Sequence, residues 1–224
     1  MGRINESLML KTKVKASSVT NLTDARYFAA WEVEWLGFNF DQGSESHLPM
    51  EMMKAISEWV DGVKIVGEFA LHSTDEMRTA IDLLKLDGIQ VSMLTDLDTL
   101  LELQSPVPVI KEVIIDAQTS AEDLRDTLET FQPQVEAFLI NFEKNGISWE
   151  NLRAGSPFSV ATLQEMAQSF PLILSIDLPV DILIEIVNLI PVYGLSFTGG
   201  EEEKVGFKSF DELDDIFEAL EVEV

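Results

Sequence analysis

The sequence predicts an α/β fold, and more narrowly a compact (β/α)8 TIM barrel that forms a single domain over residues 1–224. Short apolar runs rich in β-branched residues alternate with amphipathic stretches of about ten residues, which is the pattern of βα units around a parallel sheet. Eight such runs occur along the chain. The length of 224 residues is below the roughly 250 residues typical of such barrels but above their lower bound of about 200.

The expected strands are the apolar runs themselves, each four to nine residues long and followed by polar residues. Their ranges are 8–15, 34–40, 63–69, 88–91, 107–115, 135–141, 172–176 and 192–197. Since parallel strands end at the same edge of a barrel, the residues at their carboxyl ends are expected to meet at one mouth.

The expected helices lie between these runs and begin after residues that suit a helix amino terminus. Their ranges are 24–31, 51–59, 75–84, 96–103, 121–131, 160–170, 180–189 and 211–220. The residues expected to precede or cap them are Asn21 or Thr23, Pro49, Ser73 or Thr74, Thr95, Ser120, Ser159, Pro179 and Ser209.

A doubly wound open sheet gives the same alternation, so the pattern alone leaves barrel closure open. The first strand-to-helix junction, residues 15–20, lacks the Gly-x-Gly-x-x-Gly sequence with which such sheets hold a dinucleotide, and no Gly-x4-Gly-Lys-Ser/Thr sequence occurs. Nucleotide-binding folds therefore lose support.

Composition excludes several classes of partner and site. Forty acidic against fifteen basic residues give a net charge of −25, which repels nucleic acids and anionic membranes. The chain has no cysteine, so thiolate zinc sites and thiol nucleophiles are excluded. Without a long apolar stretch or a leader-like amino terminus, we expect a cytoplasmic protein that binds neither nucleic acid nor membrane.

Several short segments occur in the order known from one family of barrel enzymes. They are residues 14–21 with Asp24 and Ala25, then 36–40, 66–69, 87–92, 109–111 and 193–202, followed by 206–208. In that order and spacing the sequence resembles phosphoribosylanthranilate isomerase, a barrel enzyme of tryptophan biosynthesis. The resemblance implies an aldose-ketose isomerase that performs an Amadori rearrangement without a cofactor.

The residues that carry the family's chemistry differ here. The cysteine that acts as general base in the family matches Ser17, and the aspartate that acts as general acid matches Asn141. A serine hydroxyl is far too weak an acid to replace a thiolate, and an amide has no proton to exchange. The arginine that would hold the substrate carboxylate matches Ser46. The resemblance therefore implies weak or absent isomerase activity.

The phosphate-binding loops are half retained. Thr198, Gly199 and Gly200 match the family's loop after the eighth strand, and Gln90 matches a further substrate-binding position. Asp177 stands where the family has a glycine in the loop after the seventh strand, which disfavours a phosphate. We therefore expect a small-molecule ligand, phosphorylated only if Lys144, Lys204 or a divalent cation compensates.

Three charged residues near strand ends are candidate replacements for the missing catalytic groups: Lys15, Glu68 and Asp116. We favour a solvated position at the rim for Glu68. The acidic residues expected around the mouth are more simply loop carboxylates than ligands, so no metal is expected.

Two classes of function remain open. The chain is either an enzyme, as an isomerase or a relative acting on another small substrate through carboxylates at the mouth, or a noncatalytic binding or scaffold protein. A monomer and a homodimer are both compatible with the sequence.

Overall fold

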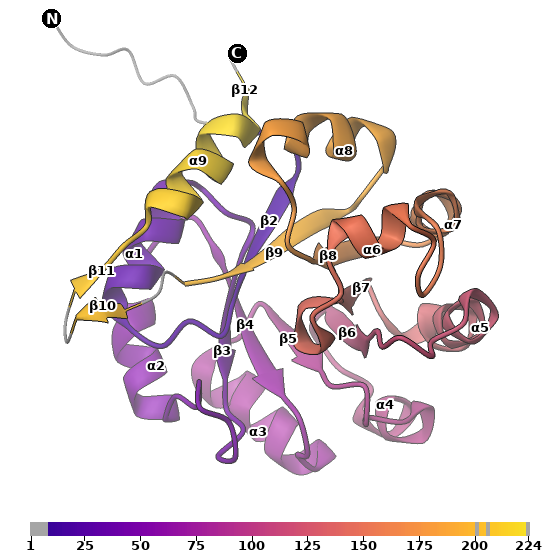
Figure 1. Cartoon of the computed structure of the whole chain (residues 1–224). Coiled ribbons are helices and arrows are strands. Elements are labelled where there is room, and N and C mark those ends of the chain that lie inside the picture. Colours follow the sequence, from indigo (N-terminus) through magenta and orange to yellow (C-terminus); the bar gives the residue numbers. More distant parts are fainter. Residues whose placement is uncertain (1–8, 200–201, 205–206, 223–224) are drawn as a thin grey trace, which may run out of the picture.

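The computed structural model describes residues 9–199, 202–204 and 207–222, and its centre is a closed barrel of eight parallel strands (Figure 1). The order around the barrel follows the order along the chain, from β2 to β9, and β9 closes the ring by pairing with β2. The barrel strands are β2 (Lys13–Ser17), β3 (Trp35–Asn39), β4 (Lys64–Phe69), β5 (Gly88–Val91), β6 (Val109–Ile114), β7 (Ala137–Asn141), β8 (Leu172–Ser175) and β9 (Gly194–Thr198). The predicted (β/α)8 barrel is confirmed.

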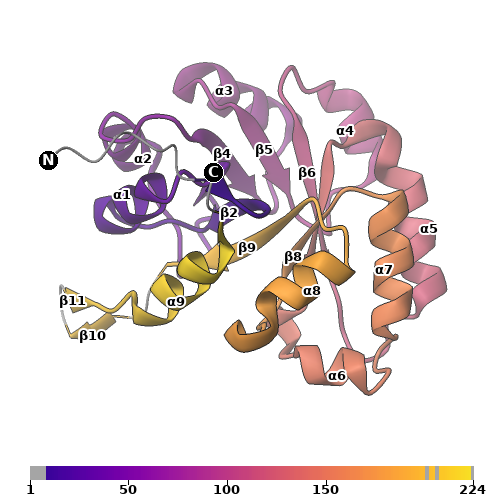
Figure 2. The same ribbon diagram turned by 90° about the horizontal axis from the view of Figure 1, so that it is seen from above.

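Helices surround the barrel on its outer side, as the view in Figure 2 shows. They are α1 (Leu22–Ala30), α2 (Met50–Ser57), α3 (Thr74–Leu84), α4 (Leu97–Leu103), α5 (Ala121–Phe131), α6 (Trp149–Arg153), α7 (Val160–Ser169), α8 (Leu183–Leu189) and α9 (Asp211–Leu220). Short 3-10 turns η1 (Gln132–Gln134), η2 (Glu143–Asn145) and η3 (Val180–Ile182) join some of them. The short helix α6 was not predicted.

Several helices begin where the sequence places a capping side chain. Ser73 and Glu76 form a reciprocal capping box at the start of α3, and Ser120 and Ser159 accept hydrogen bonds from the backbone at the starts of α5 and α7. The expected cap Thr95 is wrong by one residue, because Asp96 accepts the bond from Thr99 N at the start of α4. These bonds satisfy backbone donors that the helix itself leaves free.

Two apolar layers form because side chains alternate along each strand. The larger layer lies between the outer face of the barrel and the helices. The smaller one fills the barrel interior with Trp35, Val66, Ile110, Ala137, Leu139 and Ile173. Lys13 lies at the amino-terminal end of the barrel strands, with its Nζ atom 3.9 Å from the ring centre of Tyr193. At the carboxyl-terminal end of the strands, the side chains that point into the barrel are mostly polar.

The chain ends add small antiparallel pairs to the barrel. β1 (Met9–Leu10) pairs with β12 (Glu221–Val222), so the expected first strand, 8–15, is wrong in extent and divides into β1 and β2. The pair β10 (Glu202–Lys204) and β11 (Phe207–Lys208) extends beyond the barrel (Figure 2). Within the described ranges, no helix is long and apolar enough to cross a membrane.

Candidate active site

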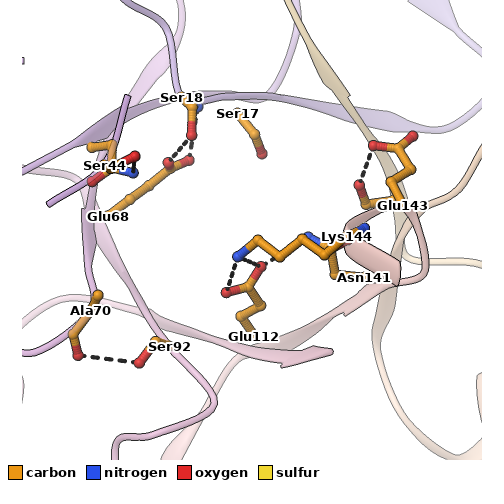
Figure 3. Close-up of polar contacts among 12 residues, drawn as sticks. Ser17, Ser18, Ser44, Glu68, Ala70, Ser92, Glu112, Asn141, Glu143 and Lys144 are labelled. Carbon is orange, nitrogen blue, oxygen red and sulfur yellow. Dashed lines mark hydrogen bonds and ion pairs between the residues drawn. The ribbon is translucent and has the colours of Figure 1, made fainter. Parts of the chain in front are cut away.

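A cavity of about 430 Å³ opens at the carboxyl ends of the barrel strands. Hydroxyl, amide and carboxylate groups line much of it, several of which are shown in Figure 3, and apolar side chains, among them Phe69, Leu94 and Leu139, form the rest of the wall. The lining residues include Ser17, Ser18, Asn39, Asp41, Ser44, Ser46, Glu68, Gln90, Ser92, Glu112, Asn141, Glu143, Lys144, Ser175 and Thr198. Residues at the carboxyl ends of several barrel strands therefore meet at one cavity.

A buried ion pair lies at one side of this cavity. Lys15 Nζ, from the first barrel strand, is 2.5 Å from Glu68 Oε1 on β4. Lys15 is fully buried and Glu68 is 5% exposed. Ser18 also donates to Glu68, through its backbone N at 3.2 Å and its hydroxyl at 2.8 Å (Figure 3). The expectation of a solvated Glu68 at the rim is wrong, because an ammonium and two further donors compensate its burial.

Ser17 is held between Lys15 and the last barrel strand. Lys15 Nζ donates to Ser17 Oγ at 2.7 Å, and Ser17 Oγ shares a second hydrogen bond of 2.7 Å with Ser196 Oγ. The hydroxyl therefore faces a cation and another hydroxyl. An ammonium that donates to an oxygen lowers the electron density available there for accepting a proton.

A second carboxylate is neutralised in the same way on the opposite wall. Both oxygens of Glu112, on β6, accept hydrogen bonds from Lys144 Nζ, at 2.7 and 2.9 Å. Asn141 Nδ2 donates to Glu112 Oε1 at 2.9 Å, while Asn141 Oδ1 accepts from the backbone N of Lys144 at 3.1 Å. Both ends of the Asn141 amide are thus engaged, which fixes its orientation (Figure 3).

Glu143 presents a carboxylate at the mouth of the cavity without a cation beside it. Ser175 Oγ donates to Glu143 Oε2 at 2.9 Å. Partial desolvation raises the pKa of Glu143, the Ser175 bond acts in the opposite direction, and the negative charge of Asp177 raises the pKa further. No ion pair to Glu143 or to Asp41 occurs among the described side chains.

Gln90 brings a polar group with an open hydrogen-bonding capacity. Its side chain lines the cavity and is 7% exposed. Within the described part of the chain, Gln90 Oε1 has no hydrogen-bond partner. A buried carbonyl oxygen without a donor is costly and uncommon.

The loop after β5 is anchored from outside the barrel. Lys111 precedes Glu112 on β6, but its side chain lies on the outer face of the strand and is 1% exposed. Its Nζ atom donates hydrogen bonds to the carbonyl oxygens of Ser92, Met93 and Thr95, at 2.7, 3.1 and 2.7 Å. Ser92 and Met93 line the cavity. Burial lowers the pKa of Lys111 to about 8, against the attraction of Glu112 and Asp96. This lysine fixes one wall of the site.

The sequence-predicted residues divide between the cavity and its surroundings. Ser17, Ser46, Glu68, Gln90, Asn141 and Thr198 line the cavity, and Lys15 lies directly behind it. Asp116 does not line it: its side chain is exposed and accepts from Gln118 N and the Thr119 hydroxyl within its own loop. Asp177 is exposed and also absent from the lining. The roles of all these residues stay predictions.

The retained glycine loop lies against a carboxylate. Gly199 borders a shallow depression together with Ser18, Ser46 and Thr198. A Cβ atom on Gly199 would come within 2.5 Å of Asp24 Oδ2, so the buried Asp24 lies directly against its backbone. Gly200, also predicted to bind phosphate, lies outside the described residues.

Sequence reasoning missed Glu112, Glu143, Ser18, Ser175 and Ser196, all of which belong to the site or its hydrogen bonds. Strand alternation contains the signal for Glu112, because it shares the inner face of β6 with Ile110. The sequence alone does not show which of the neighbours Lys111 and Glu112 points into the barrel, because that depends on how β6 is aligned with the adjacent strands. The described residues contain no group of three or more His, Asp or Glu that could hold a metal ion.

Gly37 leaves the space that the Lys15–Glu68 pair occupies. A Cβ atom there would come within 2.7 Å of Lys15 Nζ and would overlap Glu68 Oε1. Both charged groups are buried, so neither can move aside without losing its partner. Gly37→Ala is therefore expected to lower the free energy of unfolding by about 2 kcal/mol in urea denaturation.

Gly43→Ala is the matched control, because its added methyl group would meet only Asp41 Oδ1, at 3.6 Å. Equal stability of the two variants would contradict the close packing assigned to the ion pair.

Comparison with known proteins places this geometry in a family. The family model described as N-(5'phosphoribosyl)anthranilate (PRA) isomerase matches residues 14–219. None of the curated proteins searched matches the chain.

Solved structures give the same picture of the fold. Phosphoribosyl anthranilate isomerase from Thermotoga maritima superposes with a TM-score of 0.75 at 19% identity, covering 93% of this chain and 98% of that one. The enzyme from Thermus thermophilus gives 0.72 at 23% identity, with the same coverage of 93% and 98%. Another such isomerase structure holds reduced 1-(o-carboxyphenylamino)-1-deoxyribulose 5-phosphate, with a TM-score of 0.71, 19% identity and coverage of 93% and 98%.

Proposed function

Because this chain belongs to the PRA isomerase family, we propose that its barrel-mouth cavity binds a small molecule but does not perform the family's rearrangement efficiently. The observation that carries the proposal is the hydrogen bonding of Ser17, which accepts from the Lys15 ammonium at 2.7 Å. A general base must accept a proton from the substrate. A hydroxyl that already accepts from a cation is poorly suited to that role.

Lys15 itself is not a ready substitute for the base. Its Nζ atom contacts Glu68 Oε1 at 2.5 Å, and Glu68 also accepts from Ser18. As the ammonium partner of this carboxylate, Lys15 has no lone pair with which to take a proton. Before Lys15 could abstract a proton it would have to be a neutral amine, which would leave the buried Glu68 carboxylate without its cation.

The other two family functions also lack suitable groups. Asn141, which the sequence resemblance matches to the general acid, has its amide fixed between Glu112 and the backbone of Lys144. Ser46, which the resemblance matches to the carboxylate-binding arginine, shares a 2.9 Å hydrogen bond with Ser44 through its hydroxyl. Neither residue can supply a proton or a positive charge.

The direct test is turnover of PRA. Purified protein is mixed with freshly prepared PRA, and loss of substrate fluorescence is compared with that in buffer and with the Thermotoga maritima isomerase as positive control. We expect the rate to match the buffer rate. Turnover comparable to that of the positive control would refute the proposal.

A second candidate function is an enzyme acting on a different small substrate. The raised pKa of Glu143, a carboxylate at the cavity mouth to which Ser175 donates a hydrogen bond, favours this candidate because a carboxyl group with a raised pKa transfers protons more readily near neutral pH. In that case Glu143 would be the acid or base, with the Glu112–Lys144 pair placing the substrate. Noncatalytic binding and this activity would use the same cavity, so both depend on which class of ligand the cavity binds.

A further inference from the structure

We infer that the cavity takes a small polyhydroxylated molecule that carries no anionic group, and that Gln90 accepts a hydrogen bond from it. The inference rests on the proposed function, because PRA is itself a phosphate and a carboxylate. Four features of the cavity lead to it: the pairing of its lysines, the carboxylates at its rim, the open oxygen of Gln90, and its wall of hydroxyl groups.

Within the described residues, Lys144 lines the cavity and Lys15 lies directly behind it, and each is paired with a carboxylate. Lys15 Nζ is 2.5 Å from Glu68, and Lys144 Nζ lies 2.7 and 2.9 Å from the two oxygens of Glu112. An anionic ligand that attracted either lysine would leave a carboxylate that is only 4–5% exposed without its cation. Leaving a buried charge unpaired is strongly unfavourable. These lysines therefore do not provide a phosphate site.

The other charged side chains that line the cavity, among the residues the structure describes, are carboxylates. Asp41 and Glu143 line it and form no ion pair with any basic side chain in the described ranges. A phosphate or carboxylate would meet repulsion on each of these sides, whereas a hydroxyl or ammonium group would not.

Gln90 shows that the cavity is prepared for a hydrogen-bond donor. Its side chain is 7% exposed, points into the barrel from β5 beside Glu68, and has no partner for Oε1 among the described residues. A hydroxyl or amine of a ligand would supply the missing donor. Because an anionic oxygen offers no donor, the same atom also disfavours phosphate.

The hydroxyl and amide groups of the wall suit the hydroxyl groups of a ligand, and the apolar side chains beside them, among them Phe69 and Leu94, suit the C–H faces of a sugar. Ser17, Ser18, Ser44, Ser46, Ser92, Ser175 and Thr198 present hydroxyls, and Asn39 and Asn141 present amides. Hydroxyl groups act both as donors and as acceptors, so they can match the varied hydroxyls of a sugar or polyol. A volume of about 430 Å³ is in the range of sites for small ligands.

The experiment is a binding panel followed by NMR of the side-chain amide groups of the intact chain. Pentoses, hexoses and their linear polyols are titrated beside their amino, phosphate and carboxylate derivatives. We expect at least one uncharged or amino compound to bind saturably and to shift the Gln90 amide signals. Its phosphate and carboxylate derivatives should bind at least about tenfold more weakly.

Gln90→Leu separates a ligand-binding role from a structural one. The substitution removes the unpaired oxygen while keeping most of the side-chain volume, so the variant should resist urea as well as or better than the wild type. Its affinity for the compound that binds best should nevertheless fall about tenfold. Gln168→Leu, on the exposed face of α7, is the matched control and should leave affinity unchanged.

Three results would overturn the inference: tighter or equal binding of an anionic derivative, unchanged affinity in Gln90→Leu, or no binding by any uncharged or amino compound. The panel also distinguishes this inference from the proposed function. If PRA is not turned over but phosphates bind best, only the ligand class assigned here fails. If PRA is turned over, the proposed function itself fails.

Discussion

Lys15→Met is expected to lower the free energy of unfolding by about 3–5 kcal/mol, because it removes one partner of a buried ion pair. Lys15 is fully buried and Glu68 is 5% exposed, so water cannot replace the lost ammonium. Glu68 would keep only the two hydrogen bonds from Ser18. Ser17 would lose the donor that now holds its oxygen. Urea denaturation at neutral pH measures the change.

Two further variants identify the cause. Lys64→Met breaks an exposed pair, in which Lys64 and Glu34 are 2.6 Å apart with side chains 55% and 28% exposed, and should cost less than about 1 kcal/mol. The double variant Lys15→Met/Glu68→Met removes both buried charges and should recover much of the lost stability. A double variant as unstable as Lys15→Met would show that the unpaired carboxylate is not the cause.

The sequence predicted the fold better than it predicted barrel closure. From the alternation of apolar runs and capped helices, the sequence predicted the bounds of β5 (88–91), α5 (121–131) and α9 (211–220) as the structure has them. An open sheet has the same local pattern, because closure depends on β9 pairing with β2 across nearly the whole chain. The count of eight units in 224 residues, the missing dinucleotide motif and the family resemblance favoured the closed form, which periodicity alone left open.

For the site, the family resemblance identified residues that line the cavity, whereas the contacts across the barrel were missed. Ser17, Gln90 and Asn141 were matched to positions of the family, and all three line the cavity. The partnership of Lys15 and Glu68 joins residues 53 positions apart on strands that are not neighbours. No local pattern records such a pair, so Glu68 was expected in solvent.

Adjacent residues on β6 illustrate the same limit. Lys111 and Glu112 are both charged and both lie in an apolar run, yet they face opposite sides of the strand. Glu112 meets Lys144 in the cavity, while Lys111 reaches the carbonyls of the loop after β5. Periodicity predicts that neighbours alternate, but only packing decides which side is inner.

The contribution of Lys111 to the free energy of unfolding is expected to rise by about 3 kcal/mol between pH 8 and pH 10.5. Burial lowers the pKa of Lys111 from 10.5 to about 8, so the folded state releases this proton at a lower pH than the unfolded state does. Between these two values the unfolded chain binds more protons, and stability must increase with pH. Below about pH 8 the cost of burying the charge is present in full.

Lys111→Met isolates this effect from other titrating groups. Urea denaturation of both proteins at a series of pH values gives the difference in unfolding free energy, which should grow in favour of the wild type up to pH 10.5. The three carbonyl oxygens at 2.7–3.1 Å oppose the shift, since they favour the ammonium. A constant difference across this range would mean that these carbonyls outweigh burial and that Lys111 holds the cavity wall as a permanent cation.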